Sequence, residues 1–314
     1  MGSELKASVA PSAVETTYKA REAEGWIDIH FYRKVGLQLA FLFRKLRMTP
    51  TMVTLLGGVF GVVAGHLYYY RDLKTNIIGM ALHIVANLLD NADGQLARLT
   101  NKASRTGRVT DSVVDHVIFV NMYFHLAFRC LSQSTFLPVA LLGFSSGYSH
   151  ILQAAAADYY RNAYLYFVTN RTRGDLDSSV ALGSEYQTLT WREQFWSKLF
   201  LALYLNFTRQ QETLSPGLKR LRETIDRLYH DQIPYWFRNR YRDLARPAFK
   251  WWGGLMTNVR LFCLFIFLFV DRPMGFFWIE LTAFNLLLVY LLFRQENMFR
   301  SLLAMTTQQQ GVVE

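Results

Sequence analysis

The stretch that decides the fold reads DNADGQLAR at residues 90–98 and is followed by DSVVD at residues 111–115. It holds four aspartates in two pairs, spaced i,i+3 and i,i+4: Asp90, Asp93, Asp111 and Asp115. Residues at these spacings share one face of an α-helix. Both pairs lie at the polar ends of apolar segments, and an ionised Asp at membrane depth costs about 2.5–3.5 kcal/mol by insertion scales. Carboxylates retained against that cost indicate a function, and carboxylate oxygens are the ligands that Mg²⁺ and Mn²⁺ prefer.

The apolar segments around this stretch have the length of membrane spans. The chain is 51% hydrophobic and 18% charged, and its apolar residues fall in long runs rather than in short alternating stretches. We predict six spans, at residues 51–70, 76–90, 109–131, 136–167, 259–270 and 275–293. Residues 26–48 mix apolar side chains with Arg and Lys, a pattern typical of an amphipathic helix in the membrane interface. The predicted fold is an all-α membrane protein with six transmembrane helices preceded by this interfacial helix.

The spans divide the chain into six regions. They are a loose N-terminal tail (1–25), the interfacial helix (26–48), spans one to four with the aspartate motif (49–167), a helical insertion (168–252), spans five and six (253–299) and a C-terminal tail (300–314). The insertion is the least hydrophobic part of the chain, and it shows helical patterns at residues 191–207, 217–230 and 235–252. We expect it to rest on the cytoplasmic surface of the membrane.

The placement of basic residues gives the topology. Cations gather before the first span, between spans two and three and after span four, whereas the other connections are short and carry few. By the positive-inside rule, both termini and the aspartates face the cytoplasm. The net charge of +10 then reflects this bias and attraction to anionic lipids. Because the basic residues flank spans and form no single stripe, no nucleic-acid partner is expected.

Four acids in one site would repel one another, so their convergence calls for cations. Two divalent ions, Mg²⁺ or Mn²⁺, roughly 3.5–4 Å apart would neutralise them and form a clamp for an in-line phosphoryl displacement. Gly94, Ala97 and Gly107 leave the helix surfaces bare, so a flat ligand can approach the backbone. Arg98 offers a planar fork suited to a diphosphate. Asp115 is spaced to act as a general base for an attacking hydroxyl.

A structural interpretation competes with this one. Asp residues at helix ends commonly act as caps or salt-bridge partners, and for any single aspartate here that interpretation is favoured. Four aspartates with two glycines and an arginine at fixed offsets favour the metal site instead. Three other polar features are interpreted as structural: His83 and His116 as hydrogen-bonded histidines, and Asp158 with Arg161 as an ion pair. For Arg161 a phosphate-binding role stands beside the ion pair.

The motif resembles the signature of the CDP-alcohol phosphotransferase family, D-x2-D-G-x2-A-R-x8-G-x3-D-x3-D, and every fixed position is present. By that resemblance Asp90, Asp93, Asp111 and Asp115 bind two divalent metals, and Asp115 is the base. Gly94, Ala97, Arg98 and Gly107 would hold the cytidine diphosphate moiety, and a homodimer is a further implication. The family often carries Pro-Asn-x-x-Thr before the first span; this chain keeps Pro50 and Thr54 but has Thr51 in place of the Asn.

The resemblance implies an enzyme that transfers a substituted phosphate from a CDP-alcohol to a hydroxyl acceptor and releases CMP. One of the two substrates is a lipid. We favour CDP-diacylglycerol with a small polar alcohol; the alternative is CDP-ethanolamine or CDP-choline with diacylglycerol or ceramide. A metal transporter or a non-catalytic scaffold is the more remote hypothesis. A transporter should show polar residues that continue across the bundle, and the sequence reveals none clearly placed to do so.

Overall fold

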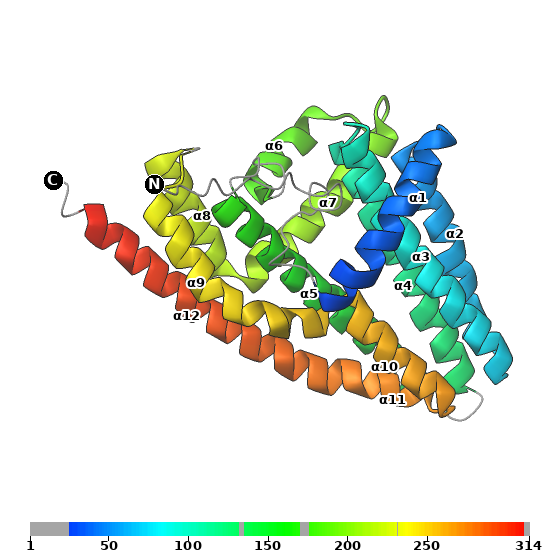
Figure 1. The fold of residues 1–314 in the computed structure, drawn as a ribbon. Helices are drawn as coiled ribbons and strands as arrows, with labels where there is room; N and C mark the ends of the chain where they lie inside the picture. Colours follow the sequence, from blue (N-terminus) through cyan, green and yellow to red (C-terminus); the bar gives the residue numbers. More distant parts are fainter. Residues whose placement is uncertain (1–24, 132–134, 170–175, 231, 311–314) are drawn as a thin grey trace, which may run out of the picture.

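The computed structural model describes residues 25–131, 135–169, 176–230 and 232–310, and Figure 1 shows that these segments form helices joined by short connections. The first element among the described residues is a π-helical turn, η3 (Asp28–Tyr32), that continues into α1 (Arg33–Lys45). Four long helices follow: α2 (Pro50–Leu67), α3 (Leu73–Leu99), α4 (Arg105–Leu131) and α5 (Phe136–Thr169). The described residues contain no β-strand, so the all-helical prediction is confirmed for them.

The second half of the chain is built from shorter helices and one long one. These are α6 (Ser179–Thr188), α7 (Phe195–Leu214), α8 (Pro216–Tyr229), α9 (Tyr235–Trp252), the 3₁₀ turn η5 (Gly253–Leu255), α10 (Thr257–Phe269), α11 (Pro273–Ile279), the π-helical turn η6 (Glu280–Phe284) and α12 (Asn285–Gln310). In Figure 1, α12 runs along one edge of the molecule and passes α9 and α8.

Local sequence signals set the starts of α2 and α3. The Thr49 side chain accepts a hydrogen bond from the Met52 amide at 3.3 Å, and Pro50 occupies the first helical position. Asp72 caps α3 in the same way through the Thr75 amide at 2.9 Å. The first predicted span therefore lies in a helix with a capped N-terminus.

Glycines on α2 allow close packing against α3 and α4. A Cβ at Gly57 would lie 3.3 Å from the Leu89 side chain on α3, and one at Gly65 would lie 3.2 Å from the Met122 backbone on α4. Small residues in such positions let helix backbones approach closely, as in small-xxx-small membrane packing. The packing fixes the end of α3 beside the beginning of α4, where the four aspartates lie.

Replacing Gly65 with Ala should therefore destabilise the protein, because the backbone of α4 has to move to admit the added methyl group. Overpacking of this kind costs about 1–3 kcal/mol. The matched control is Gly183→Ala on α6, where an added Cβ meets nothing within 4 Å. Thermal unfolding in detergent measures both. A melting temperature for Gly65→Ala equal to that of Gly183→Ala would contradict the close packing.

An aromatic core joins α5 to the later helices. Buried rings from α5, α9 and α12 meet there: Tyr160, Tyr164, Phe167, Phe237, Tyr241, Trp252 and Phe299. The Glu296 carboxylate on α12 accepts hydrogen bonds from the Gly217 amide at 3.0 Å and from the Ser215 hydroxyl at 2.8 Å. A carboxylate on the first turn of α8 stabilises that helix and secures it to α12.

The predicted spans and the helices coincide in position, with two differences. Three helical stretches among the described residues are long and apolar enough to cross a membrane: Pro50–Leu67, Tyr235–Phe269 and Pro273–Gln308. The helices α3, α4 and α5 carry polar residues that lower their hydropathy, so the six-span arrangement stays a prediction. The helix α12 continues to Gln310, whereas we predicted a tail from residue 300; Leu302 and Thr306 are fully buried and hold this part in place.

The remaining predictions concern the two ends of the chain and the insertion. The segment assigned to the interfacial helix forms η3 and α1, and α1 packs against α3. The insertion contains α6 to α9, in agreement with its predicted helical patterns, and its cytoplasmic placement is considered below. The predicted N-terminal tail lies outside the described residues up to residue 24.

Candidate functional site

Three of the four aspartates gather where α3 ends and α4 begins. Carboxylate oxygens of Asp90, Asp93 and Asp111 lie within 4.8 Å of one another. Asp115 lies one helical turn beyond Asp111 and lines the same cavity, although its carboxylate is not part of this close group. Carboxylates from two different helices, α3 and α4, therefore meet at this point, as the spacing of the motif predicted. Oxygen donors this close suit a hard divalent cation.

A hydroxyl group from α2 completes the environment of Asp93. The Thr54 side chain donates a hydrogen bond to the Asp93 carboxylate, and Thr54 is held in place by the Pro50 carbonyl at 3.1 Å. Thr51, at the position where the family often has Asn, is exposed. The retained Thr54 therefore orients a carboxylate, which the sequence alone did not assign to it.

Burial and like charge act on Asp93, which follows the second predicted span (76–90). The side chain is 5% exposed, and burial together with the neighbouring Asp90 raises the pKa of Asp93 to about 8. The hydrogen bond from Thr54 and the charge of Arg98 act in the opposite direction. A carboxylate with this pKa is poorly stabilised as an anion by the protein alone. A bound cation would supply the missing positive charge, so the residues present fit a divalent metal.

The aspartates line one end of a cavity of about 900 Å³. Gly94 and Arg98 line it as well, while Ala97 and Gly107 are not among its lining residues. The Gly107 amide instead donates to the Ser104 hydroxyl at 3.0 Å at the start of α4. Of the four predicted nucleotide contacts, the structure therefore brings two to the cavity. Four further arginines line this cavity: Arg33, Arg108, Arg161 and Arg260.

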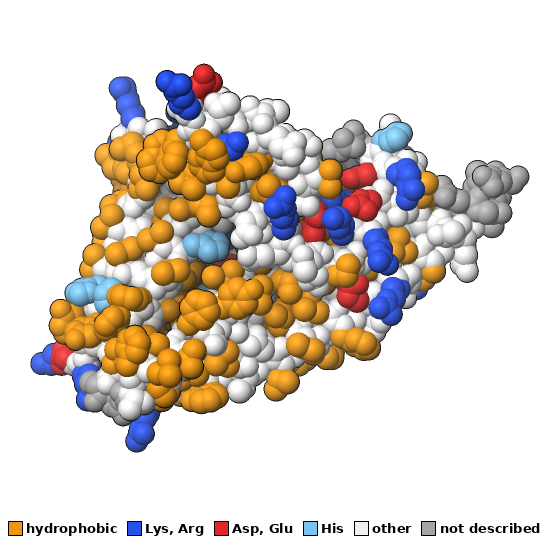
Figure 2. Space-filling view, turned by 180° about the vertical axis from the view of Figure 1, so that it is seen from behind, with side chains coloured by type: hydrophobic (Ala, Val, Ile, Leu, Met, Phe, Trp, Pro, Cys, Tyr) orange, Lys and Arg blue, Asp and Glu red, His pale blue; other side chains and the backbone are white. Residues whose placement is uncertain are grey.

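The cavity continues from the aspartates along α4 and α5 toward an apolar end. Asp115, Phe119 and Tyr123 follow one another at i,i+4 along α4 and all line it. Farther along, Phe128 and Phe136 line it and are also exposed at the surface. Figure 2 shows a hollow on a face where hydrophobic side chains gather. The cavity thus joins a charged end to an apolar side.

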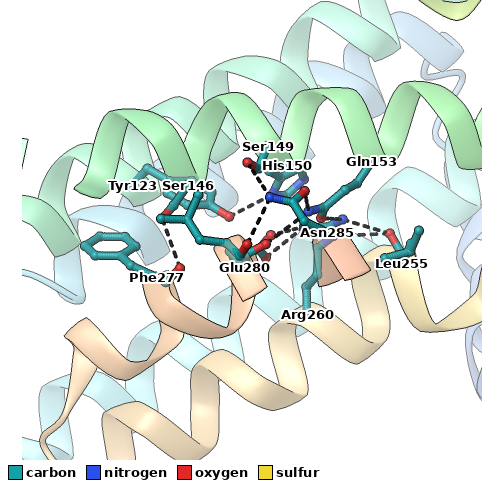
Figure 3. A network of polar contacts seen from close by, with 11 residues as sticks. Tyr123, Ser146, Ser149, His150, Gln153, Leu255, Arg260, Phe277, Glu280 and Asn285 are labelled. Atoms are coloured by element: carbon teal, nitrogen blue, oxygen red, sulfur yellow. Dashed lines mark hydrogen bonds and ion pairs between the residues drawn. The ribbon is translucent and has the colours of Figure 1, made fainter. Parts of the chain in front are cut away.

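A buried polar network reaches the cavity wall at Arg260 and was missed by the sequence reasoning (Figure 3). The Arg260 guanidinium on α10 donates to both carboxylate oxygens of Glu280 at 2.7 and 2.5 Å, and it donates to the Gln153 side chain on α5 at 2.7 Å. The Gln153 amide group donates in turn to Asn285 Oδ1 at 2.7 Å. Glu280 begins the π-helical turn η6, and such turns are frequent at functional sites.

This network could have been inferred from the sequence, because two charged residues, Arg260 and Glu280, lie inside predicted apolar spans. Intramembrane ionisable residues are rare and usually paired. Arg260 stands near the start of the fifth predicted span and Glu280 inside the sixth, so a pairing could have been inferred. The network also shows that polar residues do continue into the bundle, contrary to the sequence-based expectation. Arg260 and Glu280 neutralise each other, so the pair offers no free carboxylate for an ion path.

The insertion contributes to the wall near the aspartates. Tyr204 and Phe207 on α7 line the cavity, and the Phe207 ring meets His116 edge-on at 6.1 Å between ring centroids. The Tyr204 hydroxyl donates to the Asp177 carboxylate at 3.0 Å. Arg105, the first residue of α4, forms an ion pair with Glu185 on α6 at 2.6 Å. Residues outside the motif segment therefore enclose the charged end.

The other polar predictions have mixed outcomes. His116 Nδ1 lies 2.6 Å from the Ser112 carbonyl and His83 Nδ1 lies 3.2 Å from the Tyr68 hydroxyl, so both are hydrogen-bonded as predicted, and both also line the cavity. The predicted ion pair between Asp158 and Arg161 is wrong. The Asp158 carboxylate accepts hydrogen bonds from Asn162 at 3.0 Å and Gln211 at 3.3 Å, while Arg161 lines the cavity. The competition from two amide side chains explains the difference.

Residues 47–161 match the sequence model of the CDP-alcohol phosphatidyltransferase family. This segment holds α2, α3, α4, most of α5 and all four aspartates. The chain therefore carries a domain of the CDP-alcohol phosphotransferase family, as the motif predicted.

Relatives of this chain include two archaeal proteins and one bacterial protein. The archaetidylinositol phosphate synthase of Pyrococcus horikoshii is 29% identical over 110 residues, 35% of this chain and 55% of that protein. The bifunctional IPC transferase and DIPP synthase of Thermococcus kodakarensis is 24% identical over 119 residues, 38% of this chain and 26% of that protein. An uncharacterized protein of Aquifex aeolicus is 33% identical over 85 residues, 27% of this chain and 42% of that protein. The chain spans about half or less of the length of these relatives.

Proposed function

We propose that this protein is a metal-dependent CDP-alcohol phosphotransferase of phospholipid synthesis. One observation carries the proposal: the family motif places three carboxylates within 4.8 Å of one another at the charged end of a large cavity. The family match and the names of the relatives support the reaction class. The apolar side of the cavity supports a lipid as one of the substrates.

The residues of the site have distinct proposed roles in the transfer. Asp90, Asp93, Asp111 and Asp115 would hold two divalent cations, Mg²⁺ or Mn²⁺, which would stabilise charge on the reacting phosphate. Asp115 accepts the proton of the acceptor hydroxyl as its oxygen attacks the β-phosphorus of the CDP-alcohol. The bond from that phosphorus to the bridging oxygen of CMP breaks, and the products are a phosphodiester and CMP.

The nucleotide end of the site is assigned to a second set of residues. Arg98 supplies a planar fork for the diphosphate, and Gly94 beside it leaves room for a flat base. Ala97 and Gly107 are assigned to the same ligand by the motif, although they do not line the cavity. Ala97 and Gly107 would contribute by setting the course of the backbone beside the cavity.

The favoured substrates are CDP-diacylglycerol and a small polar alcohol. The name of the Pyrococcus horikoshii relative describes the synthesis of an inositol-phosphate lipid, which is the product type of a polar acceptor. Arg161 in the cavity wall suits a phosphate or other anionic group on that acceptor. The alternative pairs soluble CDP-ethanolamine or CDP-choline with diacylglycerol or ceramide.

In the proposed topology the aspartates open toward the cytoplasm and six helices cross the membrane. The placement of Lys and Arg supports this orientation by the positive-inside rule. The insertion then lies on the cytoplasmic side, where Tyr204 and Phe207 cover the charged end. A homodimer stays a prediction of the family resemblance.

The proposal is tested with purified protein in lipid nanodiscs, Mg²⁺ or Mn²⁺, and a panel of CDP-alcohols with matching acceptors. CMP release and the mass of the lipid product are measured together. We expect CMP and a phosphodiester lipid with CDP-diacylglycerol and a polar alcohol. Product only with a soluble CDP-alcohol and a lipid acceptor would support the alternative. Absence of CMP with every donor would overturn the assignment.

Metal binding can be measured without turnover. Adding Mn²⁺ should raise the melting temperature, because a ligand at about 100 times its Kd stabilises the folded state by roughly 2.7 kcal/mol. EDTA should reverse the shift, and Asp93→Asn should remove it. Asp158→Asn is the matched control, because Asp158 lines the same cavity but bonds to Asn162 and Gln211. An equal shift in the Asp93 variant would exclude this carboxylate as a ligand.

A further inference from the structure

Three exposed aromatic residues stand at the connection between α6 and α7. We call them the aromatic tip: Trp191 (46% exposed), Phe195 (48%) and Trp196 (66%). They lie outside residues 47–161, so the family match does not account for them. Large aromatic rings are seldom left in water together on a soluble surface, and contiguous apolar patches mark interaction sites.

The aromatic tip is held in place by the hairpin of α6 and α7. Three leucines form a small core between these helices: Leu182, Leu201 and Leu205. The Lys198 ammonium group lies 4.5 Å from the Tyr186 ring centroid and 5.6 Å from that of Trp191, and it donates to the Leu189 carbonyl at 2.5 Å. The outward direction of the rings is therefore part of the fold of the hairpin.

The same hairpin reaches the cavity. One face of α7 places Tyr204 and Phe207 in the cavity wall, and Gln211 donates to the Ala155 carbonyl on α5 at 3.2 Å. In Figure 1 the connection between α6 and α7 lies beside the beginning of α4. The aromatic tip thus stands at the end of the helices that carries the aspartates.

We propose that the aromatic tip inserts into the headgroup layer of the phospholipid bilayer, in the leaflet nearest the aspartates. Trp is enriched at membrane interfaces, and amphipathic elements with Trp and Phe bind there through buried apolar area. Arg192 is exposed and Lys198 is half-buried beside the rings, and both favour anionic headgroups. Exposed apolar residues continue along α4 at Val120 and Phe124, the surface that a bilayer would cover.

The contact has a consequence for the site. Because Tyr204 and Phe207 lie on the helix that carries Phe195 and Trp196, the bilayer holds α7 over the charged end of the cavity. The membrane then supports the part of the cavity wall that α7 forms, which lies outside the segment matched by the family model. This inference goes beyond the proposed reaction, since contact with lipid is measured without substrate.

The test uses a fluorescent label on the 314-residue chain in nanodiscs of phosphatidylcholine and phosphatidylglycerol. Trp196→Cys, combined with Cys263→Ala, is labelled with a polarity-sensitive fluorophore; Cys130 is fully buried. We expect the emission of the label to be blue-shifted relative to that of the label on unfolded protein without detergent. Lipids spin-labelled near the headgroup should quench it, and aqueous iodide should not. Glu223→Cys on α8, also exposed, is the matched control and should show the opposite quenching pattern.

Two outcomes would overturn the proposal. One is iodide quenching of the label at position 196 equal to that of the control, with no quenching by the spin-labelled lipids. The other is protection of this label from iodide without quenching by the spin-labelled lipids, which would show that protein, such as a second copy, covers the aromatic tip. If Trp196→Cys fails to fold, Phe195→Cys carries the label in the same experiment. Nanodiscs without phosphatidylglycerol should weaken lipid quenching if Arg192 and Lys198 act as inferred.

Discussion

Asp115→Asn should reduce CMP release by roughly 10²–10⁴-fold, the range that a general base contributes. The asparagine side chain has nearly the same shape but cannot accept the hydroxyl proton. Metal binding should be partly retained, because the close group of carboxylates consists of Asp90, Asp93 and Asp111. Initial rates of CMP release measure the first effect, and the shift in melting temperature with Mn²⁺ measures the second.

Two variants define the specificity of this result. Asp111→Asn removes a member of the close group, so it should lose both the Mn²⁺ shift and CMP release. Asp158→Asn, in the same cavity, should keep the Mn²⁺ shift. Unaltered CMP release in Asp115→Asn would remove that residue from the chemistry. Loss of the Mn²⁺ shift equal to that of Asp111→Asn would make Asp115 primarily a metal ligand.

Arg260→Met should produce the largest loss of stability outside the site. It leaves the Glu280 carboxylate buried without its ion-pair partner, and Glu280 is fully buried. Breaking one side of a buried pair costs about 3–5 kcal/mol, which corresponds to a fall in melting temperature on the order of 10 °C. The double variant Arg260→Met/Glu280→Leu should recover much of the loss, because replacing a whole buried pair by apolar residues is often neutral.

Arg272→Met is the control for Arg260, since Arg272 is exposed at the start of α11. Its melting temperature should stay close to that of the unaltered protein. A fall for Arg260→Met no greater than for this control would mean that the Arg260–Glu280 ion pair does not stabilise the fold. A double variant less stable than both single variants would show that the network contributes through Gln153 and Asn285 instead.

The sequence predicted that carboxylates from two helices meet, because the signal for this convergence is local. The spacing within residues 90–98 and 111–115 fixes which carboxylates share a helix face, and two adjacent helix ends suffice to bring them together. Thr54 lies far from the motif in sequence, and its contact with Asp93 depends on how α2 packs. The same holds for Arg260 and Glu280, whose pairing needs the turn between α10 and α11.

Hydropathy was a weaker guide to α3, α4 and α5 and to the last turns of α12. The helices α3, α4 and α5 place polar residues toward the cavity, which lowers the average over a window although their outer faces are apolar. The last turns of α12 have the polar composition of a tail. Nevertheless, Phe299, Leu302 and Thr306 pack against the core along one face of the helix. Average composition hides a narrow buried stripe of this kind.

The glycine packing of α2 makes the two sides of the cavity unequal in stiffness. The backbones of α2, α3 and α4 are already in close contact at Gly57 and Gly65, so this side has no free space into which it can compress. In the proposed reaction, entry of a bulky substrate and departure of its product would then depend on movement of α5 and α10, which line the cavity opposite these helices. The half that carries the aspartates would stay rigid through the proposed cycle, while α5 and α10 would move.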